Sequence, residues 1–269
     1  MRAALLALLL LSPSAAFAAK ALVVLSEPLS PSFREAYDGF LAEWGEPVDT
    51  ARADMPLPEG PHEVVLALGG RAAARARAQE RPLVVALAPA YRGVGRDAPT
   101  VRVAMTPSPE RFIAALAAAG VKRLLAVRAA PAEPEFLRRA EAAAQEAGVA
   151  IDDRIVTGPE AMPRLLRRDG VLADGIWLAP DPASVTPETF GAAREFSRAR
   201  AVPFFAPAAG LVAGEVRGDL TVSFAECGRE AARAARELLA GRDTAKVVYP
   251  GSLPAALAAP PSTAPASTK

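Results

Sequence analysis

Residues 21–44 have the sequence ALVVLSEPLSPSFREAYDGFLAEW, and this stretch decides the fold class. Its first five residues are apolar without interruption, which is the pattern of a strand that is covered on both faces. A turn at 26–28 leads to a helix whose start has the spacing of a capping box, Ser32 to Glu35. The apolar residues of this helix recur on one face: Phe33, Tyr37, Phe40, Leu41 and Trp44. A covered strand followed by an amphipathic helix predicts an α/β fold with a parallel sheet.

The same alternation continues to about residue 248. Further strands are predicted at 63–68, 82–88, 101–105, 123–128, 151–156, 175–179, 202–206, 220–224 and 247–248. Helices are predicted between most of these strands, and the last of them covers 225–239. Segment 46–61 is polar, is interrupted by proline and has no helical period. Two successive series of strands and helices, joined near residue 105, indicate two lobes.

The N-terminus has the pattern of an export signal. Arg2 precedes an apolar run at 3–11, and Pro13 and the small residues up to Ala16-Phe17-Ala18 follow, so we expect cleavage after Ala18. The alternative is a membrane anchor, but the apolar run is far shorter than the ~20 residues that span a bilayer. No cysteine follows the cleavage site, so we expect the periplasm and no lipid anchor.

Charge and residue counts exclude several classes of function. The chain has 31 Lys+Arg and 30 Asp+Glu, and removal of residues 1–18 takes away Arg2 alone, which leaves 30 of each. This balance disfavours a nucleic-acid partner. Cys227 and His62 are the only cysteine and histidine, so no internal disulfide or Cys/His zinc site is expected. We predict Cys227 to be buried, His62 to be an exposed turn residue, and no catalytic residue, metal or cofactor.

Candidate ligand-binding residues follow from the strand ends. In parallel α/β sheets, ligands lie outside the carboxyl ends of the strands. The residues at those ends are Ser26, Glu27, Gly69, Gly70, Arg71, Ala90, Tyr91, Ala129, Ala130, Pro180, Asp181 and Pro207. They are mostly small or apolar, which favours enclosure of a ligand over catalysis.

Several of these residues have a second interpretation. Backbone N–H groups at Gly69-Gly70-Arg71 could hold a carboxylate or phosphate, but Gly-Gly is also ordinary turn chemistry. Asp181 could contact a ligand or cap a turn. Tyr91 could face a cleft or pack on its own lobe. Trp44 and Trp177 lie inside predicted elements and are expected in the core.

Six stretches together resemble the ABC-transporter substrate-binding family that includes the binding proteins of tryptophan/tyrosine-type importers. They are SEPLSPSFREAYDGFLAEWG at 26–45, VVLALGGRAAARA at 64–76, RPLVVALAPAY at 81–91, PERFIAALAAAGVKRLLAV at 109–127, DGIWLAPDPASVTPETFGAAREFSRARAVPFFAP at 174–207 and ECGREAARAARELLAGR at 226–242. The resemblance implies a two-lobed type I periplasmic-binding fold, with parallel sheets flanked by helices, a multi-strand hinge and a ligand between the lobes. It also implies that the helix after Glu226 returns to the first lobe.

From the two series and the resemblance, we expect lobe 1 at 19–104 plus 222–242 and lobe 2 at 105–221 plus 243–252. Residues 253–269, rich in Ala, Pro, Ser and Thr, are predicted to be a disordered tail.

The function implied is a monomeric periplasmic solute-binding protein. It would deliver an amino-acid-like or more apolar small molecule to an ABC permease in the inner membrane. Segment 46–61 is too short and proline-rich for the helix usual in this family. An interaction subunit of envelope machinery, built on a degenerate binding fold, is therefore an alternative, and a hydrolase is a further one.

Overall fold

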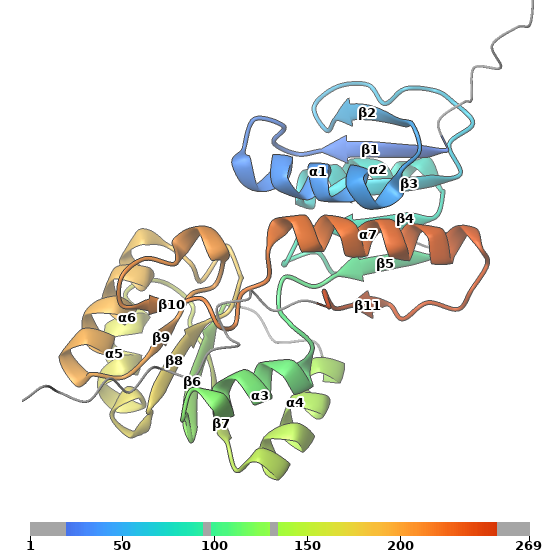
Figure 1. Ribbon diagram of the computed structural model, residues 1–269. Coiled ribbons are helices and arrows are strands. Elements are labelled where there is room, and N and C mark those ends of the chain that lie inside the picture. The colour runs from blue at the N-terminus through green and yellow to red at the C-terminus, as the bar shows by residue number, and fades with distance from the viewer. Residues whose placement is uncertain (1–19, 94–97, 130–133, 252–269) are drawn as a thin grey trace, which may run out of the picture.

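The computed structural model describes residues 20–93, 98–129 and 134–251. Within them the predicted α/β fold is confirmed, because two parallel sheets are each flanked by helices and form two lobes (Figure 1). The predicted export signal, the predicted tail and Ala130 lie outside the described residues. Among the described residues, no helix combines the length and the apolar character that crossing a membrane requires.

Lobe 1 is built on a six-stranded sheet with the order β11-β5-β4-β3-β1-β2. Its strands are β1 (Ala21–Leu25), β2 (Val48–Arg52), β3 (Val64–Leu68), β4 (Leu83–Ala86), β5 (Thr100–Val103) and β11 (Val247–Val248). Its helices are α1 (Pro31–Trp44), α2 (Gly70–Ala76) and α7 (Phe224–Leu239), with a short 3-10 helix η1 (Arg77–Gln79) after α2.

The apolar strand β1 is covered on both faces, as its sequence predicts. Ala21, Val23 and Leu25 pack in the core beneath α1 and α7, whereas Leu22 and Val24 pack in the core beneath α2. Alternate residues of a strand point to opposite faces of a sheet, so an unbroken apolar run satisfies both cores. All five residues are buried.

Lobe 2 has a five-stranded sheet with the order β10-β9-β8-β6-β7. Its strands are β6 (Arg123–Arg128), β7 (Ala150–Ile155), β8 (Gly175–Leu178), β9 (Phe204–Phe205) and β10 (Val216–Arg217). Its helices are α3 (Pro109–Ala118), α4 (Pro134–Ala147), α5 (Ala161–Arg168) and α6 (Pro187–Arg200), with 3-10 helices η2 (Gly170–Leu172) and η3 (Ala209–Leu211). Helices α3 and α4 share one core with the sheet, and α5 and α6 share the core on the other face.

The chain passes between the lobes at 104–108, after β5, and at 218–223, before α7. Helix α7 packs against α1 in lobe 1 (Figure 1). The last strand, β11, differs from the prediction that assigned 243–252 to lobe 2. It pairs in parallel with β5, where the amides of Arg102 and Ala104 donate to the carbonyls of Lys246 and Val248, each at 2.9 Å. The free edge of β5 thereby gains hydrogen-bond partners.

Segment 46–61 has no helix, as its sequence predicts, but it contains the edge strand β2, whose residues are half-buried or exposed. Two other local predictions are wrong. No strand forms at 220–224, because Leu220 and Val222 are buried within the second crossover and helix α7 begins at Phe224. Helix α1 begins at Pro31 with Ser30 as its N-cap, so the capping box at Ser32 does not form.

His62 is buried, in contrast to the predicted exposed turn. It is 5% exposed, and its Nε2 lies 2.7 Å from Asp49 Oδ2 on β2. The Arg81 guanidinium also donates to the His62 carbonyl. These bonds give the turn before β3 a polar interior that its proline- and glycine-rich sequence does not indicate.

The closest helix contact in lobe 1 is between α1 and α7. A Cβ at Gly228 would overlap the backbone carbonyl of Ala36, and a Cβ at Gly39 would overlap that of Ala225. The two backbones therefore approach so closely that only glycine fits at these positions.

Gly228→Ala should lower the free energy of unfolding by about 1–3 kcal/mol, because the added methyl group must push α7 away from α1. Gly191→Ala is a matched control, since Gly191 is also the fifth residue of its helix and has open space around it. There alanine should stabilise by about 0.5–1 kcal/mol through helix propensity. Urea denaturation of both variants checks this, and equal effects would contradict the close contact.

Candidate functional site

A cavity of about 130 Å³ lies between the two lobes, beside the first crossover. Lobe 1 and the crossover contribute Ala88, Pro89, Arg92 and residues 102–106. Lobe 2 contributes Arg128, Phe136, Trp177 and residues 179–181, and the segment around β11 contributes Val247 and Tyr249. Most of these residues follow the carboxyl ends of β4, β5, β6 and β8, which is where parallel sheets bind ligands.

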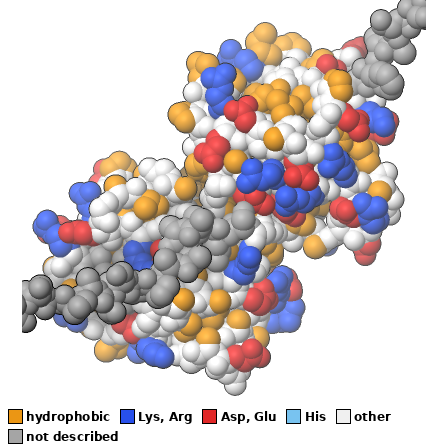
Figure 2. Space-filling view, in the orientation of Figure 1, with side chains coloured by type: hydrophobic (Ala, Val, Ile, Leu, Met, Phe, Trp, Pro, Cys, Tyr) orange, Lys and Arg blue, Asp and Glu red, His pale blue; other side chains and the backbone are white. Residues whose placement is uncertain are grey.

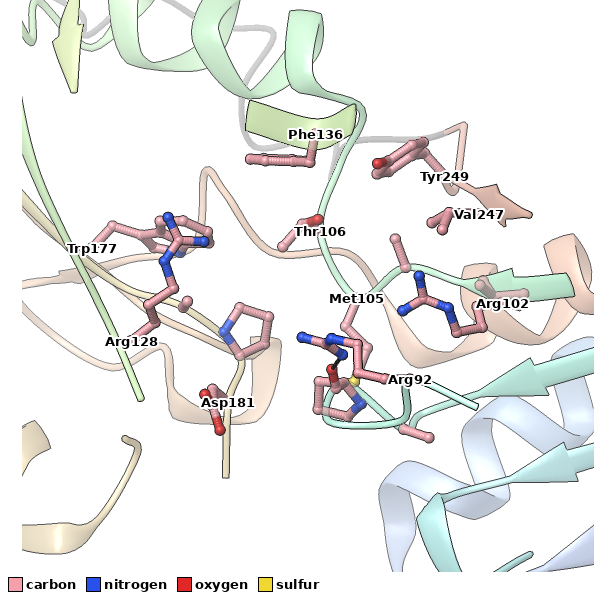
Figure 3. A pocket seen from close by; sticks show the side chains of 16 residues that line it. Arg92, Arg102, Met105, Thr106, Arg128, Phe136, Trp177, Asp181, Val247 and Tyr249 are labelled. Atoms are coloured by element: carbon pink, nitrogen blue, oxygen red, sulfur yellow. Dashed lines mark hydrogen bonds between the residues drawn. The ribbon is translucent and has the colours of Figure 1, made fainter. Parts of the chain in front are cut away.

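Two arginines stand on the lobe 1 side of the cavity (Figure 3). Arg102 belongs to β5, and its Nη1 donates to the Tyr91 carbonyl at 3.2 Å. Arg92 donates to the carbonyls of Pro89 and Tyr91 in the loop after β4. Both guanidinium groups are therefore held against the loop that forms this side of the cavity.

Arg128 and Trp177 form the opposite wall (Figure 3). Arg128 ends β6, and its Nε donates to Asp153 Oδ1 at 2.7 Å while Nη2 pairs with Oδ2. Trp177 lies in β8 and packs against Phe112 with ring centroids 4.7 Å apart. Trp177 is buried as predicted, but it is also part of the cavity wall.

Aromatic rings close the side of the cavity next to α4. Phe136 lies 6.3 Å from Tyr249 between ring centroids, and the two face the cavity in Figure 3. The Arg139 guanidinium lies 5.5 Å from the centroid of the Tyr249 ring, and it donates to Glu110 at 2.7 and 2.8 Å. The hydrogen bonds from Arg139 lower the pKa of the Glu110 carboxyl. Tyr249 thus connects the segment after β11 to the helices of lobe 2.

Asp181 lines the cavity and also ties two loops together. Its Oδ1 accepts from the amide of Ala183 at 3.0 Å, and its Oδ2 accepts from the amide of Ala129 at 3.2 Å. The structure confirms that Asp181 caps its own turn, and it places Asp181 in the cavity wall, whereas contact with a ligand stays a prediction. Ala129 takes part through its amide rather than its side chain.

The structure separates the other predicted site residues from this cavity. Ser26, Glu27 and Arg71 line a separate pocket of about 570 Å³ at the end of β1, where Glu27 and Arg71 form an exposed ion pair at 3.2 Å. The Ser26 hydroxyl accepts from the amide of Ala72 at 2.9 Å, which satisfies the start of α2 beside Gly69 and Gly70.

The remaining predicted residues do not line the interlobe cavity. Ala90 is exposed, Tyr91 packs against the α2 face of its own lobe, and Pro207 is buried. Pro180 and Asp181 are thus the predicted residues that the cavity includes.

Sequence reasoning missed the arginines and aromatic residues of the cavity. Arg128 had a detectable signal, because it is a charged residue at the carboxyl end of an apolar strand. Arg102 and Tyr249 had none, since their place depends on how β5 and β11 pair.

Nucleophilic and metal-binding groups are also placed by the structure. Within residues 20–93, 98–129 and 134–251, no three His, Cys, Asp or Glu side chains come together in a way that could hold a metal ion. Cys227 is buried as predicted, and its Sγ lies 3.8 Å from the Ala104 carbonyl oxygen. Burial, with a smaller contribution from the Glu226 carboxylate, raises the pKa of the Cys227 thiol to about 12. The thiol is therefore protonated at neutral pH.

Comparison with solved structures identifies the fold class. An ABC domain from Streptococcus pneumoniae in complex with L-Trp matches with a TM-score of 0.57 and 14% identity, covering 87% of this chain and 90% of that chain. A substrate binding protein with adhesive properties from Clostridium difficile, in its ligand-free, open structure, matches with a TM-score of 0.57 and 10% identity over the same shares. A conserved domain protein from Vibrio cholerae matches with a TM-score of 0.55 and 13% identity, covering 89% and 97%.

The chain therefore has the type I periplasmic-binding-like fold, in agreement with the sequence-based prediction. No protein-family model matches the sequence, and no curated protein matches it. At the identities above, the likeness to solved structures concerns the fold.

Asp181→Ala should destabilise the protein by about 1–3 kcal/mol, because two backbone amides lose their acceptor. Asp38→Ala is the control, since Asp38 is exposed on α1 and alanine is the better helix former. Thermal unfolding of both variants measures the difference. A neutral Asp181→Ala variant would show that the loops do not need this carboxylate.

Cys227 should not react with a thiol reagent such as dithionitrobenzoate at pH 8 until the protein unfolds. Because the folded pKa is about 12 and an unfolded thiol titrates near 9, the contribution of this thiol to stability is complete below about pH 9. It should be lost between about pH 9 and 12. Rapid labelling of the native protein would contradict the burial of Cys227.

Proposed function

We propose that the protein is the solute-binding component of an ABC-type importer and holds a small ligand in the cavity between its lobes. The observation that carries this proposal is the position of the cavity, at the carboxyl ends of strands from both lobes and beside the segment that joins them. Its wall combines apolar and aromatic side chains with a few charged groups, which is the usual composition of a small-molecule site.

The movement proposed is closure of the lobes over the ligand. The lobes are joined through 104–108 and 218–223, so rotation within a few residues changes the distance between the cavity walls. Hinge closure of this kind encloses the ligand and presents a different surface to a partner. We propose the periplasm as the site of action, on the basis of the N-terminal export pattern, and an ABC permease of the inner membrane as the partner.

The ligand proposed is amino-acid-like or more apolar. The Phe136 and Tyr249 rings and the Trp177 side chain provide a flat, apolar surface, and the similar Streptococcus pneumoniae domain is in complex with L-Trp. The Arg102 guanidinium, in the lobe 1 wall, is positioned to contact a polar group of such a ligand.

A panel of amino acids, organic acids, amines, nucleosides and sugars should contain a solute that raises Tm. At a concentration 100 times its Kd, such a solute stabilises the folded protein by about 2.7 kcal/mol. Small-angle scattering should then show a smaller radius of gyration with the ligand. Arg102→Gln should weaken binding, whereas Arg111→Gln, at an exposed position on α3, should not.

Two results would contradict the proposal. One is the absence of any stabilising solute in the panel, and the other is equal loss of binding in the Arg102→Gln and Arg111→Gln variants. The importer role has its own measurement, because cells that lack the protein should lose uptake of the ligand found in the panel. Unchanged uptake would remove the transport role and leave a binding protein.

A further inference from the structure

Arg128 is a buried cation with part of its guanidinium available to the cavity. The residue is 7% exposed, and Asp153 engages its Nε and Nη2. No hydrogen bond from Nη1 to another described residue accompanies them. A guanidinium has five N–H donors in a fixed plane, so a carboxylate that holds one side orients the remaining donors. Asp153 thus acts as a positioning residue that keeps the Nη1 donors at the cavity wall.

Trp177 supplies a second donor beside Arg128. It is 4% exposed, and its indole N–H has no hydrogen-bond partner among the described residues. Buried indole N–H groups usually have a partner, so the indole N–H of Trp177 is a donor without an acceptor beside the cavity. Trp177 is paired with Ala126, two residues before Arg128 on the neighbouring strand. The two side chains therefore lie on the same face of the lobe 2 sheet.

The residues around Arg128 and Trp177 indicate the size and the apolar character of the rest of the ligand. Phe136, Tyr249 and Met105 line the cavity nearby, and its volume of about 130 Å³ is close to the ~150 Å³ of a cavity that holds benzene. A single aromatic ring matches this space, and a carboxylate supplies the acceptors that Arg128 and Trp177 lack.

The cavity offers less to a ligand ammonium group. Among the described residues that line it, Asp181 is the one acid, and each of its two oxygens already accepts a backbone amide. The other ionised groups among the described lining residues are the guanidinium groups of Arg92, Arg102 and Arg128, which repel a cation. An amino acid would therefore gain little from its amine and lose solvation on entry.

We propose that the ligand is a small aromatic carboxylate without an ammonium group. Its carboxylate accepts hydrogen bonds from Arg128 Nη1 and Trp177 Nε1, and its ring packs against Phe136 and Tyr249. This inference rests on the proposed function and deepens it by assigning the class of ligand and the two residues that recognise it.

Three matched probes test the class: 3-phenylpropanoate, L-phenylalanine and 2-phenylethylamine, measured by isothermal titration calorimetry on the protein without its export signal. The carboxylate should bind at least tenfold more tightly than the amino acid, and the amine should not bind. Tighter binding of L-phenylalanine than of 3-phenylpropanoate would overturn the inference.

Trp177→Phe tests the donor, because it removes the indole N–H and keeps an aromatic ring. Affinity for 3-phenylpropanoate should fall about tenfold or more, as expected for a hydrogen bond to a charged group. Trp44→Phe is the matched control, since Trp44 also has a buried indole N–H without a partner among the described residues but lies in the core under α7. Its affinity should not change, and equal losses in the two variants would overturn the role of Trp177.

Arg128→Lys and Asp153→Asn complete the test. Lysine keeps the charge but loses the planar fork, so affinity should fall while the preference for the carboxylate over the amine remains. Asp153→Asn should weaken binding less than Arg128→Lys does. If the three probes fail but another solute of the panel stabilises the protein, this inference is wrong and the proposed function stands. If no solute at all binds, the proposed function itself fails.

Discussion

The backbones of α1 and α7 lie so close together that Gly39 and Gly228 leave no space for a side chain. The rest of the arrangement depends on this contact, because α7 is the element that brings the chain back to lobe 1 after lobe 2 has been built. Close approach of two helices increases the number of dispersion contacts and fixes their separation. It also fixes the end of the second crossover at Ser223, the N-cap of α7, and with it the place where the two lobes meet.

Charge is distributed differently at the surface and in the cavity. On the face shown in Figure 2, basic and acidic side chains are intermixed over both lobes, which agrees with the even balance of the sequence. Among the described residues that line the cavity, guanidinium groups outnumber carboxylates, and Arg128 is buried there against Asp153. Removing a charge from water is costly unless the charge is paired. Arg128 can therefore be buried at this position because Asp153 pairs with it. The position of the Arg128 charge in the cavity wall thus depends on Asp153, which is not among the residues that line the cavity.

The fold could be predicted from the sequence where burial and periodicity agree, as in β1 and α1. The prediction failed where a buried apolar segment is not a strand, and where a strand is polar because it is not fully buried. Leu220 and Val222 are apolar because a crossover is buried, whereas β2 is polar because it lies at a sheet edge. The candidate site was predictable at Asp181, since it follows directly on a strand end. It was not predictable at Tyr249, whose position depends on a pairing between β11 and β5, about 145 residues apart in sequence.

Tyr249 has a mechanical consequence. Within the part of the chain that the structure describes, the backbone crosses between the lobes at 104–108 and 218–223. The contact of Tyr249 with Phe136 and Arg139 adds a third attachment between the strand that bears it and the helices of lobe 2. Any rotation of the lobes must slide or break this aromatic contact. Tyr249 therefore links the relative position of the lobes to the wall of the cavity, because the same ring lines the cavity and contacts both parts of the molecule.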